Sequence, residues 1–232
     1  MVLYEHGGTL SQRGFMQAII FDLDDTLYDL SRHRAQHLRR AWASWLTGIA
    51  VLEADAVITR AVRERIFFAD MEQFLVRAGV ADATQRSRLV EESRATWFTD
   101  LHLDEGVAEL LSTLAGSYTL GLITNGPSWT QRAKIEQLHL SQWFPHMLVS
   151  GEYGCDKPDG RIFAAMLERL TVDVSAAVMV GDNPDADIRG AHGVGMRAIW
   201  IRHSHMVYPD DLAPAWGVVD HVTAIPGVLQ LP

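Results

Sequence analysis

Hydrophobic and polar positions fall into short blocks whose type changes regularly along most of the chain. Apolar runs rich in branched residues are typical of strands buried on both faces, and they stand at 17–21, 118–123, 147–149, 176–180, 197–201 and 218–222. Helical spacing of apolar positions fills most of the gaps, at 107–114, 128–138, 161–170 and 186–192. Strands that alternate with helices predict an α/β fold with a doubly wound parallel sheet.

One block breaks this alternation directly after the first strand. Helical spacing there runs through 31–48, about 54–77 and about 84–98 without an intervening strand, and its aromatic stripe includes Trp42 and Trp45. The stripe indicates that the block has an interior of its own. We therefore expect a loose tail at 1–16, an α/β core made of 17–29 and 100–232, and a helical cap subdomain at 30–99. Met16 is an alternative start of translation.

Composition narrows the class of protein further. The 232 residues are 48% hydrophobic and 21% charged, which excludes a disordered or low-complexity chain. The net charge of −9 argues against broad nucleic-acid binding, which needs a basic face. We expect no membrane partner, because no apolar run of about 18 residues occurs and the N-terminus does not resemble a signal peptide. The single cysteine, Cys155, excludes an intramolecular disulfide and suits a cytoplasmic protein, whereas oligomeric state is left open.

Polar side chains follow four of the predicted strands, at the edge where parallel sheets bind ligands. Crowded carboxylates repel one another and need a cation, and hard oxygen ligands suit Mg²⁺. A lysine and a hydroxyl beside such a cation would receive a phosphoryl group, and an aspartate there could attack it. The side chains concerned are Asp22, Asp24, Thr124, Asn125, Lys157, Asp182 and Asp187.

These residues lie in segments that resemble the four ordered motifs of the haloacid dehalogenase-like (HAD) hydrolases. The segments read FDLDDTLYD, ITNG, DKPD and VGDNPDADIRGA, and the resemblance covers about 18–200 without the inserted block. The insert resembles the helical cap of the family's phosphatase-rich branch. The resemblance implies a Rossmann-like core and a Mg²⁺-dependent phosphatase that acts on a small phosphorylated metabolite through an aspartyl-phosphate.

The resemblance also implies a role for each motif residue. Asp22 matches the catalytic nucleophile, which also binds the metal. Asp24 matches the catalytic general acid and base, and its backbone carbonyl matches a metal contact. Thr124 matches the hydroxyl that binds the phosphoryl group, with Asn125 beside it in the same substrate-binding stretch. Lys157 matches the lysine that holds nucleophile and phosphate together.

The last motif supplies the remaining metal ligands. Asp182 matches a direct ligand, and Asp187 matches a second acid that acts directly or through water. Gly160 departs from the family pattern, because a proline is common there, but Lys157 is unaffected.

Alternative functions remain at this stage. A haloacid dehalogenase uses the same fold, but its aspartate attacks carbon and needs neither a metal nor a second aspartate, so Asp24 argues against it. A phosphomutase would use the same residues with a different cap. A signalling receiver module is much shorter and carries its aspartate after a middle strand. The substrate is left open among nucleoside monophosphates, phosphoglycolate and sugar phosphates.

The start of the cap carries two further candidate sites. His33 and His37 are four residues apart, a spacing that can bind a metal, although a solvated helix face is the simpler interpretation. No acid occurs between 31 and 52, where Arg32 and Arg34 stand nearest the predicted site. These arginines either form a solvated basic face or offer positive charge to an incoming phosphate. For Cys155 a structural role is expected.

Overall fold

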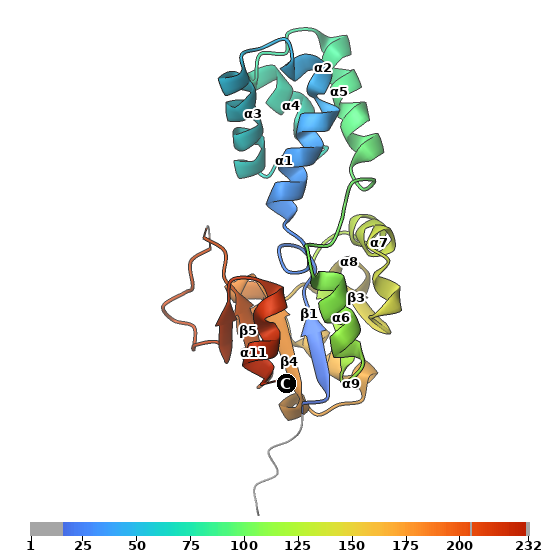
Figure 1. The fold of residues 1–232 in the computed structure, drawn as a ribbon, viewed down its shortest axis with the longest axis vertical. Coiled ribbons are helices and arrows are strands. Elements are labelled where there is room, and N and C mark those ends of the chain that lie inside the picture. The colour runs from blue at the N-terminus through green and yellow to red at the C-terminus, as the bar shows by residue number, and fades with distance from the viewer. Residues whose placement is uncertain (1–15, 205, 231–232) are drawn as a thin grey trace, which may run out of the picture.

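The computed structural model describes residues 16–204 and 206–230. The predicted tail at 1–16 lies outside these residues apart from Met16, which packs against the core. Six strands form one parallel sheet in the order β3-β2-β1-β4-β5-β6, so the predicted α/β fold with a parallel sheet is confirmed (Figure 1). The strands are β1 Ala18–Phe21, β2 Thr119–Thr124, β3 His146–Val149, β4 Ala177–Gly181, β5 Arg197–Ile201 and β6 Gly217–Val219.

The central strand β1 fixes where the site lies. It pairs with β2 on one side and β4 on the other, and Phe21 stands level with Leu122 and Val180. The segments that follow Phe21, Leu122 and Val180 therefore leave the sheet at the same edge. This register brings Asp22 and Asp182 together, with Thr124 at the end of the neighbouring strand.

Helices cover both faces of the sheet, because successive strand residues point to opposite sides. Ile19 and Phe21 face one hydrophobic cluster, and Ala18 and Ile20 face the other. The first cluster is closed by α6 Val107–Ala115, α7 Ser128–Gln137 and α11 Ile225–Leu229, and the second by α9 Gly160–Leu170 and α10 Arg189–Gly193. Short elements complete the core: α8 Ser150–Tyr153, the 3₁₀ turns η1 Leu140–Gln142, η2 Val174–Ala176 and η4 Val222–Ala224, and the π-helical turn η3 Pro184–Ile188.

The residues at 30–99, which we call the cap, pack around an interior of their own. In Figure 1 the cap stands above the core, and two stretches of chain connect the two parts. Trp42, Trp45 and Phe74 are buried together, and the Trp42 and Phe74 rings stack at 5.8 Å between centroids. The tryptophan stripe is thus part of this interior. The helices are α1 Leu30–Ala41, α2 Ala43–Leu46, α3 Val51–Arg63, α4 Met71–Arg77 and α5 Ala83–Thr96.

The expectation of one continuous helix at about 54–77 is wrong, because α3 and α4 are separate. Arg65 adopts a left-handed conformation with φ of 49°, and the Ile66 N–H donates to the Ala61 carbonyl at 3.2 Å. This hydrogen bond is the usual way in which a left-handed residue ends a helix. The apolar spacing of the sequence continues across the break, so periodicity alone did not reveal it.

Two other elements predicted in the core also differ from the expectation. The strand expected at 218–222 ends at Val219, because the His221 side chain accepts from the Thr223 N–H and starts a 3₁₀ turn. The helix expected at 186–192 is divided into η3 and α10. Among the described residues, no helix is long and apolar enough to cross a membrane.

Gly190 provides a test of the packing between α10 and α9. A Cβ at Gly190 would overlap the Phe163 ring and approach the Pro158 Cα to 3.0 Å. Gly190→Ala should therefore lower the free energy of unfolding by about 1–3 kcal/mol, the usual cost of overpacking a core. Gly193→Ala is the matched control on the same helix, since nothing lies within 4 Å of its Cβ position. Urea denaturation measures both variants. Equal stabilities would contradict this account of the packing.

Candidate active site

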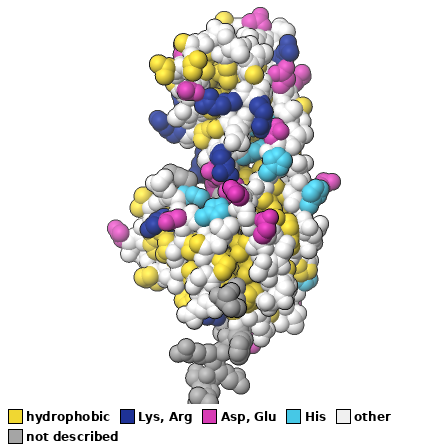
Figure 2. Space-filling view, in the orientation of Figure 1, with side chains coloured by type: hydrophobic (Ala, Val, Ile, Leu, Met, Phe, Trp, Pro, Cys, Tyr) yellow, Lys and Arg dark blue, Asp and Glu magenta, His cyan; other side chains and the backbone are white. Residues whose placement is uncertain are grey.

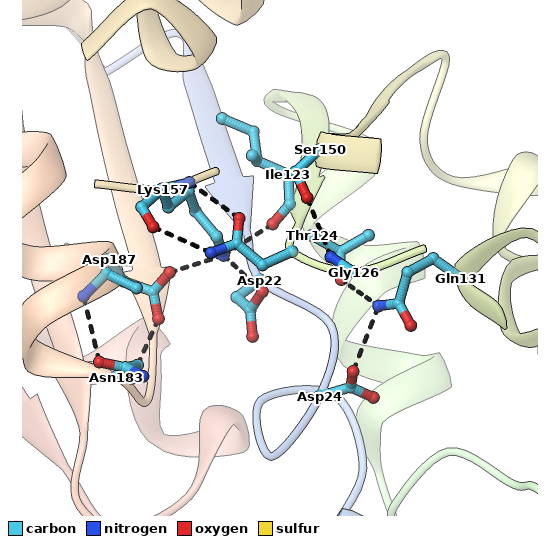
Figure 3. Close-up of polar contacts among 12 residues, drawn as sticks. Asp22, Asp24, Ile123, Thr124, Gly126, Gln131, Ser150, Lys157, Asn183 and Asp187 are labelled. Atoms are coloured by element: carbon cyan, nitrogen blue, oxygen red, sulfur yellow. Dashed lines mark hydrogen bonds and ion pairs between the residues drawn. The ribbon is translucent and has the colours of Figure 1, made fainter. Parts of the chain in front are cut away.

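The buried ammonium of Lys157 joins β1 and β2 to the turn η3 that follows β4. Lys157, which precedes α9, donates from Nζ to Asp22 Oδ1 at 2.5 Å, to Asp187 Oδ1 at 2.7 Å and to the Ile123 carbonyl at 2.9 Å (Figure 3). Its side chain is almost completely buried. Burial alone would lower the pKa of Lys157, but the two carboxylates outweigh that effect and raise it above its ordinary value. Lys157 is therefore a permanent positive charge inside the site.

Asn125 positions Lys157 through the backbone. Its Nδ2 donates to the Lys157 carbonyl at 2.9 Å, and its Oδ1 accepts from the Lys157 N–H at 2.8 Å. The sequence placed Asn125 among the substrate-binding residues. In the structure both polar atoms of its amide are engaged, so the side chain fixes the loop that carries Lys157.

Three carboxylates converge beside Lys157. Asp22, Asp182 and Asp187 each place an oxygen within 4.8 Å of the other two. Asp187 is fully buried, and its Oδ2 accepts from the Asn183 N–H at 3.0 Å. No hydrogen-bond donor among the described residues reaches the Asp182 carboxylate or Asp22 Oδ2. These oxygens are the ones available to a cation.

The same three carboxylates carry more negative charge than Lys157 can balance. Burial raises the pKa of Asp22 to about 7, with Lys157 opposing the shift. Burial raises the pKa of Asp182 to about 9, and the neighbouring charges of Asp22 and Asp187 add to the increase. A buried cluster with surplus negative charge and hard oxygen donors fits a divalent cation such as Mg²⁺.

Asp24 lies on the same loop as Asp22 but in the opposite electrostatic environment. Lys134 Nζ donates to both of its oxygens at 2.7 Å, Gln131 Nε2 donates to Oδ2 at 3.2 Å, and the Tyr28 hydroxyl donates to Oδ1. Burial alone would raise the pKa of Asp24, but the Lys134 charge and these hydrogen bonds lower it below its ordinary value. Asp24 is therefore held as a carboxylate.

Sequence reasoning missed Lys134, Gln131 and Tyr28. Gln131 and Lys134 are three residues apart on α7, so both side chains project from one face of that helix. Because α7 begins shortly after Thr124, this spacing was a usable signal. Gln131 Nε2 also donates to the buried Thr124 hydroxyl, which leaves the hydroxyl proton of Thr124 free to donate.

All the predicted site residues line one cavity of about 260 Å³ between the core and the cap. The set is Asp22, Asp24, Thr124, Asn125, Lys157, Asp182 and Asp187. From the cap, Leu30 and Arg65 line the same cavity, and Arg65 was not anticipated from the sequence.

The interpretation of His33 and His37 as a solvated face is wrong. Both residues are buried, and their rings pack against Trp97 at centroid distances of 5.3 and 4.9 Å. His33 Nε2 lies 3.0 Å from the Trp97 carbonyl, and burial lowers the pKa of His37 to about 4. Within the described residues, the group of metal-binding side chains is Asp22, Asp182 and Asp187, without a histidine. The pair belongs to the packing between α1 and the end of α5.

Arg32 and Arg34, the other candidate residues at the start of the cap, lie in different environments. Arg32 is more than half exposed and pairs with Asp104 in the second connecting stretch, so its charge is already balanced. Arg34 is buried. Cys155 is a free cysteine that packs against the second hydrophobic cluster, as a structural role requires.

Comparisons with known proteins agree with this geometry. Pyrimidine 5'-nucleotidase YjjG of Escherichia coli is 35% identical over 114 residues, which is 49% of this chain and about half, 51%, of that protein. The 5-amino-6-(5-phospho-D-ribitylamino)uracil phosphatase YigB of the same organism is 30% identical over 221 residues, covering 88% of this chain and 89% of that one. The crystal structure of a 2-haloacid dehalogenase from Pseudomonas syringae pv. Tomato DC3000 is 29% identical with a TM-score of 0.60, covering 93% of this chain and 99% of that chain.

The family model described as haloacid dehalogenase-like hydrolase matches residues 16–195. That span contains the cap and all four motifs, whose polar residues meet in one cavity. The resemblance seen in the motifs is confirmed: the chain belongs to the haloacid dehalogenase-like hydrolases.

Proposed function

We propose that this enzyme is a Mg²⁺-dependent phosphatase that hydrolyses a small phosphomonoester through an aspartyl-phosphate on Asp22. The observation that carries the proposal is geometric: Asp22 and Asp24 line one cavity together with Thr124 and Lys157, and Asp22 shares a cluster of three carboxylates that could hold a cation. Two carboxylates in one cavity can divide the roles of nucleophile and proton carrier. A dehalogenase, whose aspartate attacks carbon, requires neither a second aspartate such as Asp24 nor a surplus of buried carboxylates.

The residues present fit a magnesium ion. Asp22, Asp182 and the backbone carbonyl of Asp24 would hold it, with Asp187 in contact directly or through water. Bound there, Mg²⁺ would neutralise the oxygens of the phosphoryl group. The protein itself supplies the positive charge of Lys157 and the hydroxyl proton of Thr124 to the same group, so the phosphate would be held from the side of the core.

The reaction then proceeds in two steps. An oxygen of Asp22 attacks phosphorus, the bond to the leaving oxygen breaks, and Asp24 gives that oxygen a proton. Water next attacks phosphorus, Asp24 accepts the proton of the water, and phosphate leaves while the Asp22 carboxylate is restored. Lys134 favours the charged form of Asp24, which suits the second step. Donating a proton in the first step requires Asp24 to move off Lys134 once the substrate is bound.

The substrate class follows from the cavity and from the names of the relatives. A space of about 260 Å³ suits a small metabolite, and the two Escherichia coli relatives are named for a nucleotide and for a ribityl phosphate. We place this enzyme in the cytoplasm, acting on such metabolites and not on nucleic acid. A phosphomutase is the second candidate, because the same residues could return the phosphoryl group to a phosphorylated sugar.

The first test separates Asp22 from Asp24 with p-nitrophenyl phosphate, whose leaving group needs little protonation. Asp22→Asn should abolish turnover, because an amide is a poor nucleophile at phosphorus. Asp24→Asn should release a burst of p-nitrophenol and then turn over slowly, because the water that attacks the aspartyl-phosphate lacks a base. Alkyl phosphates should lose about 10²- to 10⁴-fold in rate. Stopped-flow absorbance measures the burst. Near-normal activity in Asp22→Asn would overturn the mechanism.

The second test concerns the metal. Hydrolysis of p-nitrophenyl phosphate should vanish in EDTA and return with added Mg²⁺. Full activity in EDTA would favour a metal-free reaction such as that of a dehalogenase.

The third test uses the dependence of stability on pH. The raised pKa values of Asp22 and Asp182, about 7 and about 9, mean that the folded protein binds more protons than the unfolded chain above pH 4. In EDTA, these groups should therefore make stability fall as pH rises from 6 to 8. Mg²⁺ competes with those protons, so it should raise the melting temperature more at pH 8 than at pH 6.

Asp182→Asn should remove most of the Mg²⁺ effect. In EDTA at pH 8 it should raise the melting temperature by at least about 2 °C, the change that about 1 kcal/mol makes in a protein of this size. Asp185→Asn is the matched control, since Asp185 is exposed and pairs with Arg189. Differential scanning fluorimetry gives all the values. An equal response to Mg²⁺ in both variants would contradict the assignment of Asp182.

A further inference from the structure

Arg65 is the one charged cap residue among the described residues that lines the cavity containing Asp22 and Asp24. It lies two residues after the end of α3, in the connection that leads to α4. Figure 2 shows Lys and Arg side chains beside Asp and Glu side chains at the waist between the cap and the core. Since the core side of the cavity is acidic, a guanidinium from the cap side gives the cavity two walls of opposite charge.

The backbone at Arg65 gives no reason for an arginine. Its φ of 49° lies in the left-handed region, where glycine is favoured because a Cβ is strained. The helix-ending hydrogen bonds come from the backbone: Arg65 N–H to the Val62 carbonyl at 3.0 Å and Ile66 N–H to the Ala61 carbonyl at 3.2 Å. A glycine would make both bonds at lower cost. Strained residues of this kind cluster where a side chain has a function.

The charge of Arg65 is not balanced by a partner. Among the described residues, no carboxylate forms an ion pair with Arg65 or with Arg34, and the buried Nε of Arg34 has no hydrogen-bond partner. Arg63 and Arg94 also lack an ion pair among the described residues, but they lie outside this cavity. The cap arginines that form ion pairs are Arg32, Arg39, Arg40, Arg60, Arg77 and Arg88.

The two unpaired guanidinium groups are close enough to interact. Burial lowers the pKa of Arg34, the negative charge of Asp25 raises it, and the positive charge of Arg65 lowers it again. Arg65 lines the cavity and Arg34 is buried behind it, so the two cations together provide positive charge for binding an anion. Mg²⁺ and Lys157 would offset Asp22, Asp182 and Asp187, and Lys134 offsets Asp24. Asp25, the remaining acid that lines the cavity, acts on Arg34, so the charge of Arg65 is the one left for a ligand.

The connection that carries Arg65 is also anchored. Phe67 and Phe68 lie against Trp129 of α7, and their ring centroids are 6.0 and 6.2 Å from that of Trp129. Both rings also contact Trp97. These contacts cross from the cap to the core. They hold the Arg65 backbone beside the cavity, so little freedom remains to be lost when a ligand binds.

We infer that Arg65, supported by Arg34, forms a subsite for a second anionic group, so that the preferred substrates carry a carboxylate or second phosphate besides the phosphomonoester. The inference rests on the proposed function for the site of the first phosphate. A charge-assisted hydrogen bond to the second group would add affinity that a neutral substrate of the same length lacks.

Binding can be measured without turnover, using phosphonates that cannot be hydrolysed. Isothermal titration with Mg²⁺ present compares propylphosphonate with 3-phosphonopropionate, which has a carboxylate in place of the terminal methyl group. A third ligand, propane-1,3-diphosphonate, carries a second phosphonate instead. The wild type should bind at least one doubly anionic ligand about 10- to 100-fold more tightly than propylphosphonate. The ligand that gains affinity identifies the second group.

Arg65→Gly should remove this preference and leave the two classes of ligand within about threefold of each other. Its melting temperature should equal or exceed that of the wild type, because glycine adopts the left-handed conformation freely. Arg65→Lys should keep part of the preference. Arg63→Ala is the matched control, because it removes an exposed charge two residues away and outside the cavity. Arg34 is left in place, since replacing a buried residue risks unfolding the cap.

Two outcomes would overturn the inference: a wild type without the preference, or an Arg65→Gly variant that keeps it. Hydrolysis assays keep this separate from the proposed function. If the wild type binds the doubly anionic ligand in an Arg65-dependent way but hydrolyses no phosphomonoester, the subsite stands and the phosphatase proposal fails. If the wild type hydrolyses phosphomonoesters but shows no preference for the doubly anionic ligands, the phosphatase proposal stands and the subsite inference fails.

Discussion

The site depends on one buried cation, the ammonium of Lys157, which lies between Asp22 and Asp187. Without it, three buried carboxylates would meet with no cation beside them, and their mutual repulsion would be relieved only by protons or by moving the strand ends apart. With it, one negative charge is balanced, while the pKa values of Asp22 and Asp182 remain raised by burial and by the remaining acids. In the proposed function, a divalent ion would take the place of the protons on this cluster. The amide of Asn125 fixes the Lys157 backbone, so the position of this charge is set by the sheet and not by a flexible side chain alone.

The two aspartates of the first loop show how position after a strand can place two like side chains in different environments. Asp22 is the first residue after β1 and remains close to the sheet, where burial and other acids raise its pKa. Asp24 is two residues further on and lies against α7, where Lys134 and Gln131 lower its pKa. A chain that leaves a parallel sheet and turns within a few residues can thus place like groups in opposite environments. In the proposed mechanism, Lys134 makes the acid role of Asp24 conditional, because its pairing favours the charged form of the carboxylate.

The sequence predicted those features that depend on local order along the chain. The strands, the parallel sheet and the four clusters at its edge follow from runs of apolar residues and from what comes after each run. Features that depend on contacts between distant segments were missed or misjudged. His33 and His37 looked solvent-exposed because nothing in the spacing shows that Trp97, 60 residues later, covers them. Arg65 looked like an ordinary helical position because the apolar period runs through a break made by backbone hydrogen bonds. Lys134 was partly predictable. Its spacing from Gln131 indicated that both side chains lie on one helix face, but not that this face would contact Asp24.

Helix α7 connects these observations. Its inner face carries Gln131 and Lys134, which bind Asp24, and its exposed face carries Trp129, on which Phe67 and Phe68 of the cap rest. The residues that follow Arg65 in the chain are therefore in contact with the helix that controls the charge of Asp24. Trp129 and Lys134 are five residues apart on α7, so the contact with the cap and the contact with Asp24 lie within two turns of one helix. The packing of the cap and the pairing of Asp24 therefore depend on the same short element of the core.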